Sequence, residues 1–275
     1  MAALLAVVSG ILWGAADFGG GLASRRLPSM VVVGWSQAAA FVALVGGALI
    51  THTGVPDGEW LLWGLLTGLA GATGLVCFYQ ALSIGTMGVV SPIGGLGALV
   101  PVVADLIAGQ LPSGVQAVGM AVALIGAVAA SGPELSGKAS PASVVLAAVA
   151  GLMFGLTFLG MDRGAETSPL YTAIGMRLSS LLIFGALAVA LGTLGGVGRS
   201  DVPMLVAIGI ADGGANLVFS VASTLGLVSV VSVLGSLYPV VTVLLARAFL
   251  AERLRPVQIF GAIAALGGVA LVSLG

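Results

Sequence analysis

The sequence predicts an all-α membrane protein with ten transmembrane helices, arranged as two inverted repeats of five helices each. Three observations carry this prediction: an apolar composition, ten apolar runs of membrane-crossing length, and an internal repeat. Hydrophobic residues make up 59% of the 275 residues, and charged residues only 7%. A soluble domain needs roughly a quarter of its residues charged to keep its surface wet. The chain is therefore expected to lie in a lipid bilayer.

The internal repeat has an offset of 141 residues. Residues 230–237, VVSVLGSL, lie 141 positions after residues 89–96, VVSPIGGL. Glycines and prolines recur at the same offset, in the pairs Gly10/Gly151, Gly14/Gly155, Pro28/Pro169, Gly34/Gly175 and Gly68/Gly209. A nearly gapless register over half the chain indicates internal duplication. We assign residues 1–132 to the first five-helix repeat and residues 143–275 to the second.

Ten apolar runs follow one another along the chain. They cover residues 3–23, 30–50, 61–82, 87–108, 115–132, 143–161, 170–191, 202–224, 228–249 and 257–274. Each is close to the ~20 residues that a helix needs to cross the hydrocarbon core. Five crossings per repeat, an odd number, insert the second repeat upside down relative to the first. This is the plan of many secondary transporters, whose substrate site lies near the midplane between the repeats.

Prolines interrupt the fourth and the ninth run. Pro92 and Pro101 lie in 87–108, and Pro239 lies in 228–249, each with glycines nearby. Proline removes a backbone hydrogen bond from a helix, and a transmembrane helix tolerates this where neighbouring groups compensate. We interpret both sites as kinks or hinges rather than as substrate-binding residues.

Composition also excludes some classes of function. A net charge of -1 with scattered basic residues argues against a nucleic-acid partner. Cys77 is the only cysteine and His52 the only histidine, so neither an internal disulfide nor a histidine-rich metal site is expected. We expect no cofactor. The first apolar run is expected to be a retained helix rather than a cleaved signal.

Several paired motifs resemble a known family. They are Leu12-Trp13-Gly14, Ser91-Pro92-Ile93, Tyr238-Pro239-Val240-Val241, and Ala251-Glu252-Arg253-Leu254 with Gln258 and Gly261. Together they resemble the EamA repeat of the drug/metabolite transporter superfamily, in two copies over the whole chain. The resemblance implies ten helices, export of small molecules and no ATP-binding domain. The first copy departs from the pattern, with Gln110-Leu111-Pro112 where the second has Glu252-Arg253-Leu254. We therefore interpret the Glu-Arg pair as a structural cap on one side only.

Charged side chains within the apolar runs are the candidate functional residues. A charge at mid-membrane costs roughly 2.5–3.5 kcal/mol on insertion scales, so each needs a partner, a water-filled cavity or a neutral form. Asp17 shares a helix face with Trp13, Gly14 and Gly10, and this face is expected to point into the bundle. A polar stripe on the run 202–224 is typical of a cavity wall; it contains Asp212, Asn216, Ser220 and Ser223.

Arg177, in the run 170–191, has two readings that stay open. It is either the structural partner of a buried acid, Asp212 or Asp17, or a direct substrate contact. One arginine cannot fully pair two deep acids, so one acid must be protonated, hydrated or bound to a cation, and we expect Asp17 to be that acid. Trp13 and Tyr79 either pack in the core or bind substrate. The candidate substrate-binding residues are Trp13, Asp17, Tyr79, Arg177, Asp212 and Asn216.

Three further charged residues are placed near the ends of helices. Asp105 is expected close to the end of the fourth helix, within reach of interfacial water. Asp162 and Arg163 are expected on the loop side of the sixth helix, within one turn of its end.

These features predict a secondary transporter rather than an enzyme. It would move a small metabolite, amino-acid-like or otherwise cationic or zwitterionic, across the cytoplasmic membrane by alternating access, as an exporter. Its partners would be the solute, the lipid bilayer and, as a candidate coupling ion, the proton; monomer and homodimer stay open. A membrane scaffold is the alternative. An intramembrane aspartyl protease is less favoured, because the Gly-x-Gly-Asp and Tyr-Asp contexts are absent around Asp17 and Asp212.

The distribution of basic residues predicts the orientation. With ten crossings, one set of loops holds Arg25, Arg26, Lys138, Arg199, Arg253 and Arg255, whereas the other set holds only Arg163. Cytoplasmic loops carry the excess of lysine and arginine, so both termini are expected outside the cytoplasm. The family resemblance implies the opposite orientation, and we follow the charge bias of this chain.

Overall fold

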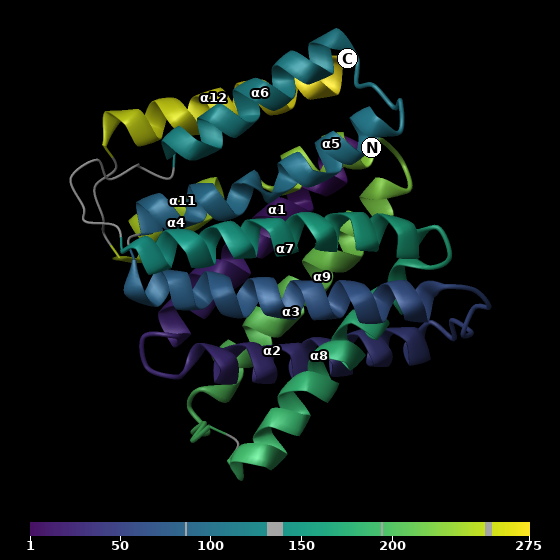
Figure 1. The fold of residues 1–275 in the computed structure, drawn as a ribbon, viewed down its shortest axis with the longest axis vertical. Helices are drawn as coiled ribbons and strands as arrows, with labels where there is room; N and C mark the ends of the chain where they lie inside the picture. Colours follow the sequence, from purple (N-terminus) through teal and green to yellow (C-terminus); the bar gives the residue numbers. More distant parts are fainter. Residues whose placement is uncertain (86, 131–139, 194, 251–254) are drawn as a thin grey trace.

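The protein is a bundle of helices joined by short turns (Figure 1). The computed structural model describes residues 1–85, 87–130, 140–193, 195–250 and 255–275. The helices are α1 (Ala2–Ala23), α2 (Ser29–Ile50), α3 (Trp60–Ile84), α4 (Met87–Gly95), α5 (Leu99–Ile107), α6 (Gly114–Ala130), α7 (Pro141–Ala165), α8 (Pro169–Leu191), α9 (Val202–Ser223), α10 (Val228–Gly235), α11 (Tyr238–Leu250) and α12 (Pro256–Leu274), with a 3-10 turn, η1 (Leu96–Ala98), between α4 and α5.

These helices make ten membrane crossings, as predicted. Eight helical segments in the described part of the chain are long and apolar enough to span a bilayer, and two shorter apolar segments, Gly114–Ala130 and Val228–Thr242, complete the ten. An even number of crossings brings both chain ends to the same side of the bundle, where Figure 1 marks them. The protein is therefore an all-α, multi-pass membrane protein.

Two of the crossings are broken, at the positions where the sequence places prolines and glycines. α4, which contains Pro92, ends at Gly95, and η1 links it to α5. α10 ends at Gly235, and α11 begins again at Tyr238. Tight turn bonds carry the chain across this second break, from the Leu237 N–H to the Leu234 carbonyl (3.3 Å) and from the Val240 N–H to the Leu237 carbonyl (3.0 Å). The fourth and ninth crossings thus each consist of two half-helices.

The packing between the repeats follows a twofold pattern. α1 packs against α9 as α7 packs against α3, and α2 packs against α9 as α8 packs against α3. α1 contacts the broken pair α10–α11 as α7 contacts α4–α5, while α6 meets its own counterpart α12 and α2 meets α8. Each of these contacts therefore has a mate or joins two equivalent helices, as expected for two inverted five-helix repeats related by an axis in the membrane plane.

Equivalent glycines make the same close contacts in both repeats. A Cβ at Gly14 would lie 2.7 Å from the Tyr238 carbonyl oxygen, and a Cβ at Gly155 would lie 2.5 Å from the Gly97 carbonyl oxygen. Both distances are shorter than a side chain tolerates, so the helix backbones touch directly. Lipid supplies no hydrophobic force between helices, and close packing through small residues replaces it.

The α6–α12 seam uses the same device. Gly119 and Gly126 of α6 face Gly261 and Gly268 of α12, each at the backbone of the opposite helix. In Figure 1 these two helices lie side by side along one edge of the bundle. The seam therefore joins the last crossing of each repeat.

One charged position differs from expectation. Asp105 was expected to reach interfacial water, but it is only 5% exposed, and its Oδ2 accepts a hydrogen bond from the Ser229 N–H at 3.0 Å. Ser229 is in the first turn of α10, where free N–H groups and the helix dipole favour a carboxylate. Asp162 and Arg163 lie in the last turn of α7, which ends at Ala165, as expected for residues within one turn of the end of the sixth helix. Three charged residues named above lie outside the described residues: Lys138, Glu252 and Arg253.

We predict that Gly268→Ala destabilises the protein whereas Gly267→Ala does not. A Cβ at Gly268 would lie 2.7 Å from both the Ala123 Cα and the Gly119 carbonyl oxygen, whereas a Cβ at Gly267 would meet nothing within 4 Å. Overpacking of this kind costs about 1–3 kcal/mol, so the midpoint of thermal unfolding in detergent should fall by several degrees for Gly268→Ala only. Equal midpoints for the two variants would show that α6 and α12 can move apart to accommodate the added methyl group without loss of stability.

Candidate functional site

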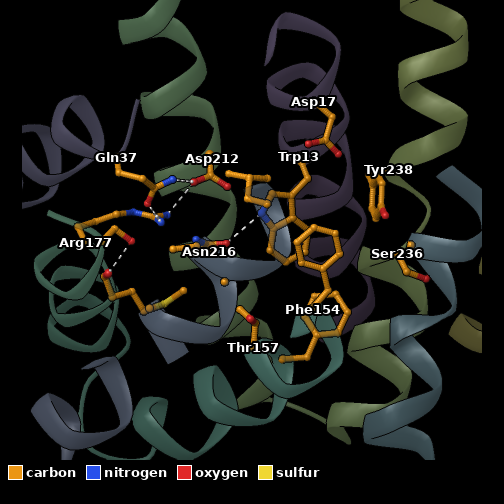
Figure 2. A pocket seen from close by; sticks show the side chains of 18 of the residues that line it. Trp13, Asp17, Gln37, Phe154, Thr157, Arg177, Asp212, Asn216, Ser236 and Tyr238 are labelled. Carbon is orange, nitrogen blue, oxygen red and sulfur yellow. Dashed lines mark hydrogen bonds and ion pairs between the residues drawn. The ribbon is translucent and has the colours of Figure 1, made fainter. Parts of the chain in front are cut away.

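A cavity lies where the two repeats meet (Figure 2). Its walls come from α1, α2, α3, α4, α7, α8, α9 and the break between α10 and α11. Its polar lining residues are Trp13, Asp17, Gln37, Thr157, Arg177, Ser180, Asp212, Asn216, Ser236 and Tyr238. About 70 Å³ of this space is open to the centres of water-sized molecules, which is room for a handful of waters. Five of the six predicted site residues line it, and Tyr79 does not.

Arg177 forms a buried network with Asp212 and Gln37. Its Nη2 lies 3.1 Å from the Asp212 Oδ2, and its Nη1 donates to the Gln37 Oε1. Gln37 in turn donates its Nε2 to the Asp212 Oδ2 at 3.0 Å. Arg177 is 3% and Gln37 2% exposed. Of the two acids considered as partners for Arg177, the structure thus pairs it with Asp212, through a bridging amide from α2.

The Arg177 guanidinium has N–H donors that make no hydrogen bond to the described residues. Within the described part of the chain, its Nε and Nη2 have no hydrogen-bond partner, although Nη2 lies in the ion pair with Asp212. Buried donors without a partner cost free energy. Arg177 is therefore both a structural partner of Asp212 and a source of N–H groups at the cavity wall.

Trp13 and Asn216 form the middle of the cavity wall. The Trp13 Nε1 donates to the Asn216 Oδ1 at 2.9 Å, which fixes the indole across the α1–α9 contact. The same ring packs against Phe158 (5.6 Å between centroids) and Phe219 (5.5 Å). Trp13 thus packs in the core and also presents a surface to the cavity, so the two readings of this residue are compatible.

Asp17 has no basic partner among the described side chains. The ion pairs there are Arg26–Asp201, Arg163–Glu166 and Arg177–Asp212. The Asp17 carboxylate lies within hydrogen-bonding reach of the Tyr79 hydroxyl, and its charge interacts with that of Asp212. Tyr79 is buried behind Asp17, with its hydroxyl against Gly20 of α1. It therefore supports the acid rather than lining the space.

The cavity straddles the twofold axis, but its chemistry does not follow the symmetry. Trp13 and Asp17 of α1 correspond in the repeat to Phe154 and Phe158 of α7, and all four line the cavity. Likewise Asp212 and Asn216 of α9 correspond to Gly71 and Leu75 of α3, which also line it. The acidic and amide groups of α1 and α9 are therefore matched by rings and small or apolar side chains at the equivalent positions of α7 and α3.

Comparison with known families decides the identity of this architecture. The sequence pattern of the EamA-like transporter family matches residues 1–132 and 141–274, which is nearly the whole chain in two copies. The chain belongs to the EamA-like transporter family. It is thus a membrane transporter of the drug/metabolite transporter superfamily, in agreement with the resemblance seen in its motifs.

A solved structure supports the fold of this EamA-like transporter. Described only as a crystal structure of a protein, it matches with a TM-score of 0.81 at 18% sequence identity, over 99% of this chain and 96% of that chain. No curated protein matches the sequence. The structural likeness concerns the arrangement of the helices alone.

Part of the predicted polar stripe lies away from the cavity of this EamA-like transporter. Asp212 and Asn216 line the cavity, whereas Ser220 and Ser223 are buried between helices, where the Ser223 Oγ donates to the Ser220 carbonyl at 3.1 Å. A helix stripe three turns long extends beyond a cavity of this size. Ser220 and Ser223 therefore belong to the packing of α9.

Sequence reasoning did not include Gln37 and Tyr238 among the site residues. Each is a polar residue whose counterpart in the other repeat has no polar side chain: Leu178 for Gln37 and Gly97 for Tyr238. Functional asymmetry between duplicated halves appears where the repeats differ. A comparison of the two repeats for polar residues without a polar counterpart would have identified both.

We predict that Arg177→Met destabilises the EamA-like transporter strongly, and that Arg177→Met/Asp212→Asn restores most of the loss. The single change leaves the Asp212 carboxylate buried without its cation, which costs about 3–5 kcal/mol. The double change removes both charges and keeps an oxygen that accepts from Gln37. Thermal unfolding in detergent measures both variants. If the single and double variants unfold at the same temperature, the charge of Asp212 is not held by Arg177.

Proposed function

We propose that the protein is a secondary transporter that moves a small cationic or zwitterionic metabolite across the cytoplasmic membrane by alternating access. The observation that carries this proposal is the charge of the cavity. Two aspartates and one arginine line it, and the arginine is paired with only one of the aspartates. A solute with a positive group would supply the missing partner.

The positive group would bind at Asp17. A carboxylate in a cavity without a basic partner must be protonated, hydrated or bound to a cation. Asp17 lines the space beside Trp13, and Phe154 lines it opposite. Aromatic faces attract cations by about 0.5–2 kcal/mol. The Asp17 end of the cavity thus has the chemistry of an ammonium site.

A negative group on the same solute would bind at Arg177. Its Nε and Nη2 have no hydrogen-bond partner among the described residues, and Asn216 and Ser180 line the cavity with it. Hydrogen bonds between a guanidinium and a carboxylate are the strong, charge-assisted kind. An amino-acid-like solute, with one group of each sign, therefore suits both ends of the cavity.

The proposed mechanism is alternating access with net export. The fourth and ninth crossings are broken beside the cavity, so their half-helices can move separately with little loss of backbone hydrogen bonding. Asp17 can carry a proton when no solute is bound, which makes the proton the proposed coupling ion. The two other functions considered have less support. A scaffold needs no charged cavity, and a protease dyad needs two acids that share a proton, whereas Asp212 is paired with Arg177.

Uptake into proteoliposomes tests the proposal. The purified protein is reconstituted and offered a labelled panel of primary amines, amino acids, carboxylic acids and neutral sugars. We expect transport of amines or amino acids above that of protein-free vesicles. Transport restricted to carboxylic acids or sugars, or no transport of any solute, would contradict the proposal.

We predict that Asp17→Asn lowers transport of the best cationic or zwitterionic solute at least about tenfold. A hydrogen bond to a charged group contributes about 1.5–3 kcal/mol, and 1.4 kcal/mol corresponds to a factor of ten. Because Asp17 has no ion pair with a described side chain to lose, the variant should remain folded and inserted. The dependence of transport on pH should also weaken, since Asp17, facing Tyr79, Asp212 and Tyr238, would no longer titrate.

The matched control for Asp17→Asn is Glu166→Gln. Glu166 is an exposed acid on a turn and pairs only with Arg163 in the described part of the chain. This control should transport at the wild-type rate. Wild-type flux of Asp17→Asn at every pH would remove Asp17 from the site.

A further inference from the structure

We propose that the Tyr238 hydroxyl completes the ammonium site at Asp17 and selects ammonium groups that carry N–H bonds over quaternary ones. This inference rests on the proposed cation-binding role of the cavity and adds a specificity-determining residue to it. Figure 2 shows the relevant arrangement, with Asp17 and Tyr238 on one side of Trp13 and the Arg177 network on the other.

Tyr238 is buried, but its hydroxyl has nothing to bind. It is the first residue of α11, directly after the break in the ninth crossing, and it is 6% exposed. Its hydroxyl has no hydrogen-bond partner among the described residues, although the side chain lines the cavity. Phenylalanine would fill the same volume without burying an unpaired polar group, which is costly. The unpaired hydroxyl therefore indicates that its hydrogen-bond partner is a molecule that enters the cavity.

Packing fixes the position of the Tyr238 hydroxyl. The ring meets Phe78 edge to face, with centroids 6.3 Å apart and planes at 84°. The hydroxyl oxygen lies against α4, 3.2 Å from where a Cβ on Gly94 would stand. On the backbone side, the Tyr238 carbonyl abuts Gly14 of α1. A glycine at each contact point thus lets the ring reach across the twofold axis from α11 to α4.

The hydroxyl and the Asp17 carboxylate serve the same end of the cavity. Both residues line the space, and Figure 2 shows them on the same side of Trp13. The Tyr79 hydroxyl already occupies the protein side of Asp17. An occupant therefore meets one carboxylate and one phenolic oxygen that is free to accept a hydrogen bond.

A primary ammonium group matches this pair of acceptors. It has three N–H donors, of which one can reach Asp17 and a second the Tyr238 oxygen. A quaternary ammonium group has the same charge and no donor, so it gains nothing from the phenol oxygen. Because Gly97 stands at the Tyr238 position of the first repeat, the chain offers this hydroxyl on one side only.

Binding of two small probes tests the proposal. Trp13 lines the cavity, so its fluorescence reports occupancy in a full-length variant in which Trp35, Trp60 and Trp63 are replaced by phenylalanine. Methylammonium and tetramethylammonium are titrated separately into this protein, into its Tyr238→Phe form and into its Asp17→Asn form. Thermal unfolding of each form shows that it is folded.

We expect Tyr238→Phe to weaken methylammonium binding about tenfold, the effect of one hydrogen bond to a charged group. It should leave the affinity for tetramethylammonium within twofold of the parent. Asp17→Asn should weaken the binding of both probes. This pattern would distinguish the contribution of the Tyr238 hydroxyl to binding from that of the Asp17 charge.

The remaining outcomes overturn either this inference or the proposal beneath it. Equal losses for both probes in Tyr238→Phe, or no loss for either, would show that Tyr238 only packs in the core. If neither cation changes Trp13 fluorescence in the parent form, the cation-binding function itself fails, whatever Tyr238 does.

Discussion

The ion pair between Arg177 and Asp212 is the interaction on which the rest of the structure depends. A guanidinium at this depth is stable only with a partner, and here the partner comes from α9 while Gln37 of α2 bridges the two. The pair therefore holds three helices from both repeats around one point. It also uses the single base that lines the cavity among the described side chains. Asp17 is left as the acid without a counterion among the side chains that the structure describes.

The duplication accounts for the arrangement of the helices around the cavity, and the sequence differences between the repeats account for its polar side chains. Equivalent glycines let α1 and α7 approach the two broken crossings in the same way, so a space with twofold-related walls arises between the repeats. Trp13 and Asp17 face it in one repeat, and Phe154 and Phe158 in the other. A solute bound on the axis would thus meet different side chains at equivalent positions of the two repeats. Such a site orients its occupant, because the two walls differ.

The number and ends of the helices could be predicted because the bilayer fixes the length of an apolar run and prolines mark its breaks. The cavity face of Asp17 followed from its helical spacing to Gly10 and Gly14. The partner of Arg177 did not follow, because the choice between Asp17 and Asp212 depends on how α2, α8 and α9 meet. Asp105 was misplaced for the same reason: its partner, the Ser229 N–H, is 124 residues away in sequence. Tyr238 was predicted only as part of a motif that resembles the family, although its side chain lines the cavity.

The central claim is that the cavity carries one more negative charge than it can pair and therefore takes up a positive group. Charge displacement on a solid-supported membrane measures this most directly. Proteoliposomes that contain the protein are exposed to a jump in methylammonium concentration, and the transient current is recorded for the wild type and for Asp17→Asn. At a pH at which Asp17 is ionised before the jump, the account predicts a transient inward displacement of positive charge as methylammonium enters the cavity of the wild type, and no such displacement in the variant. Equal currents in both proteins, or a current evoked by acetate and not by methylammonium, would contradict it.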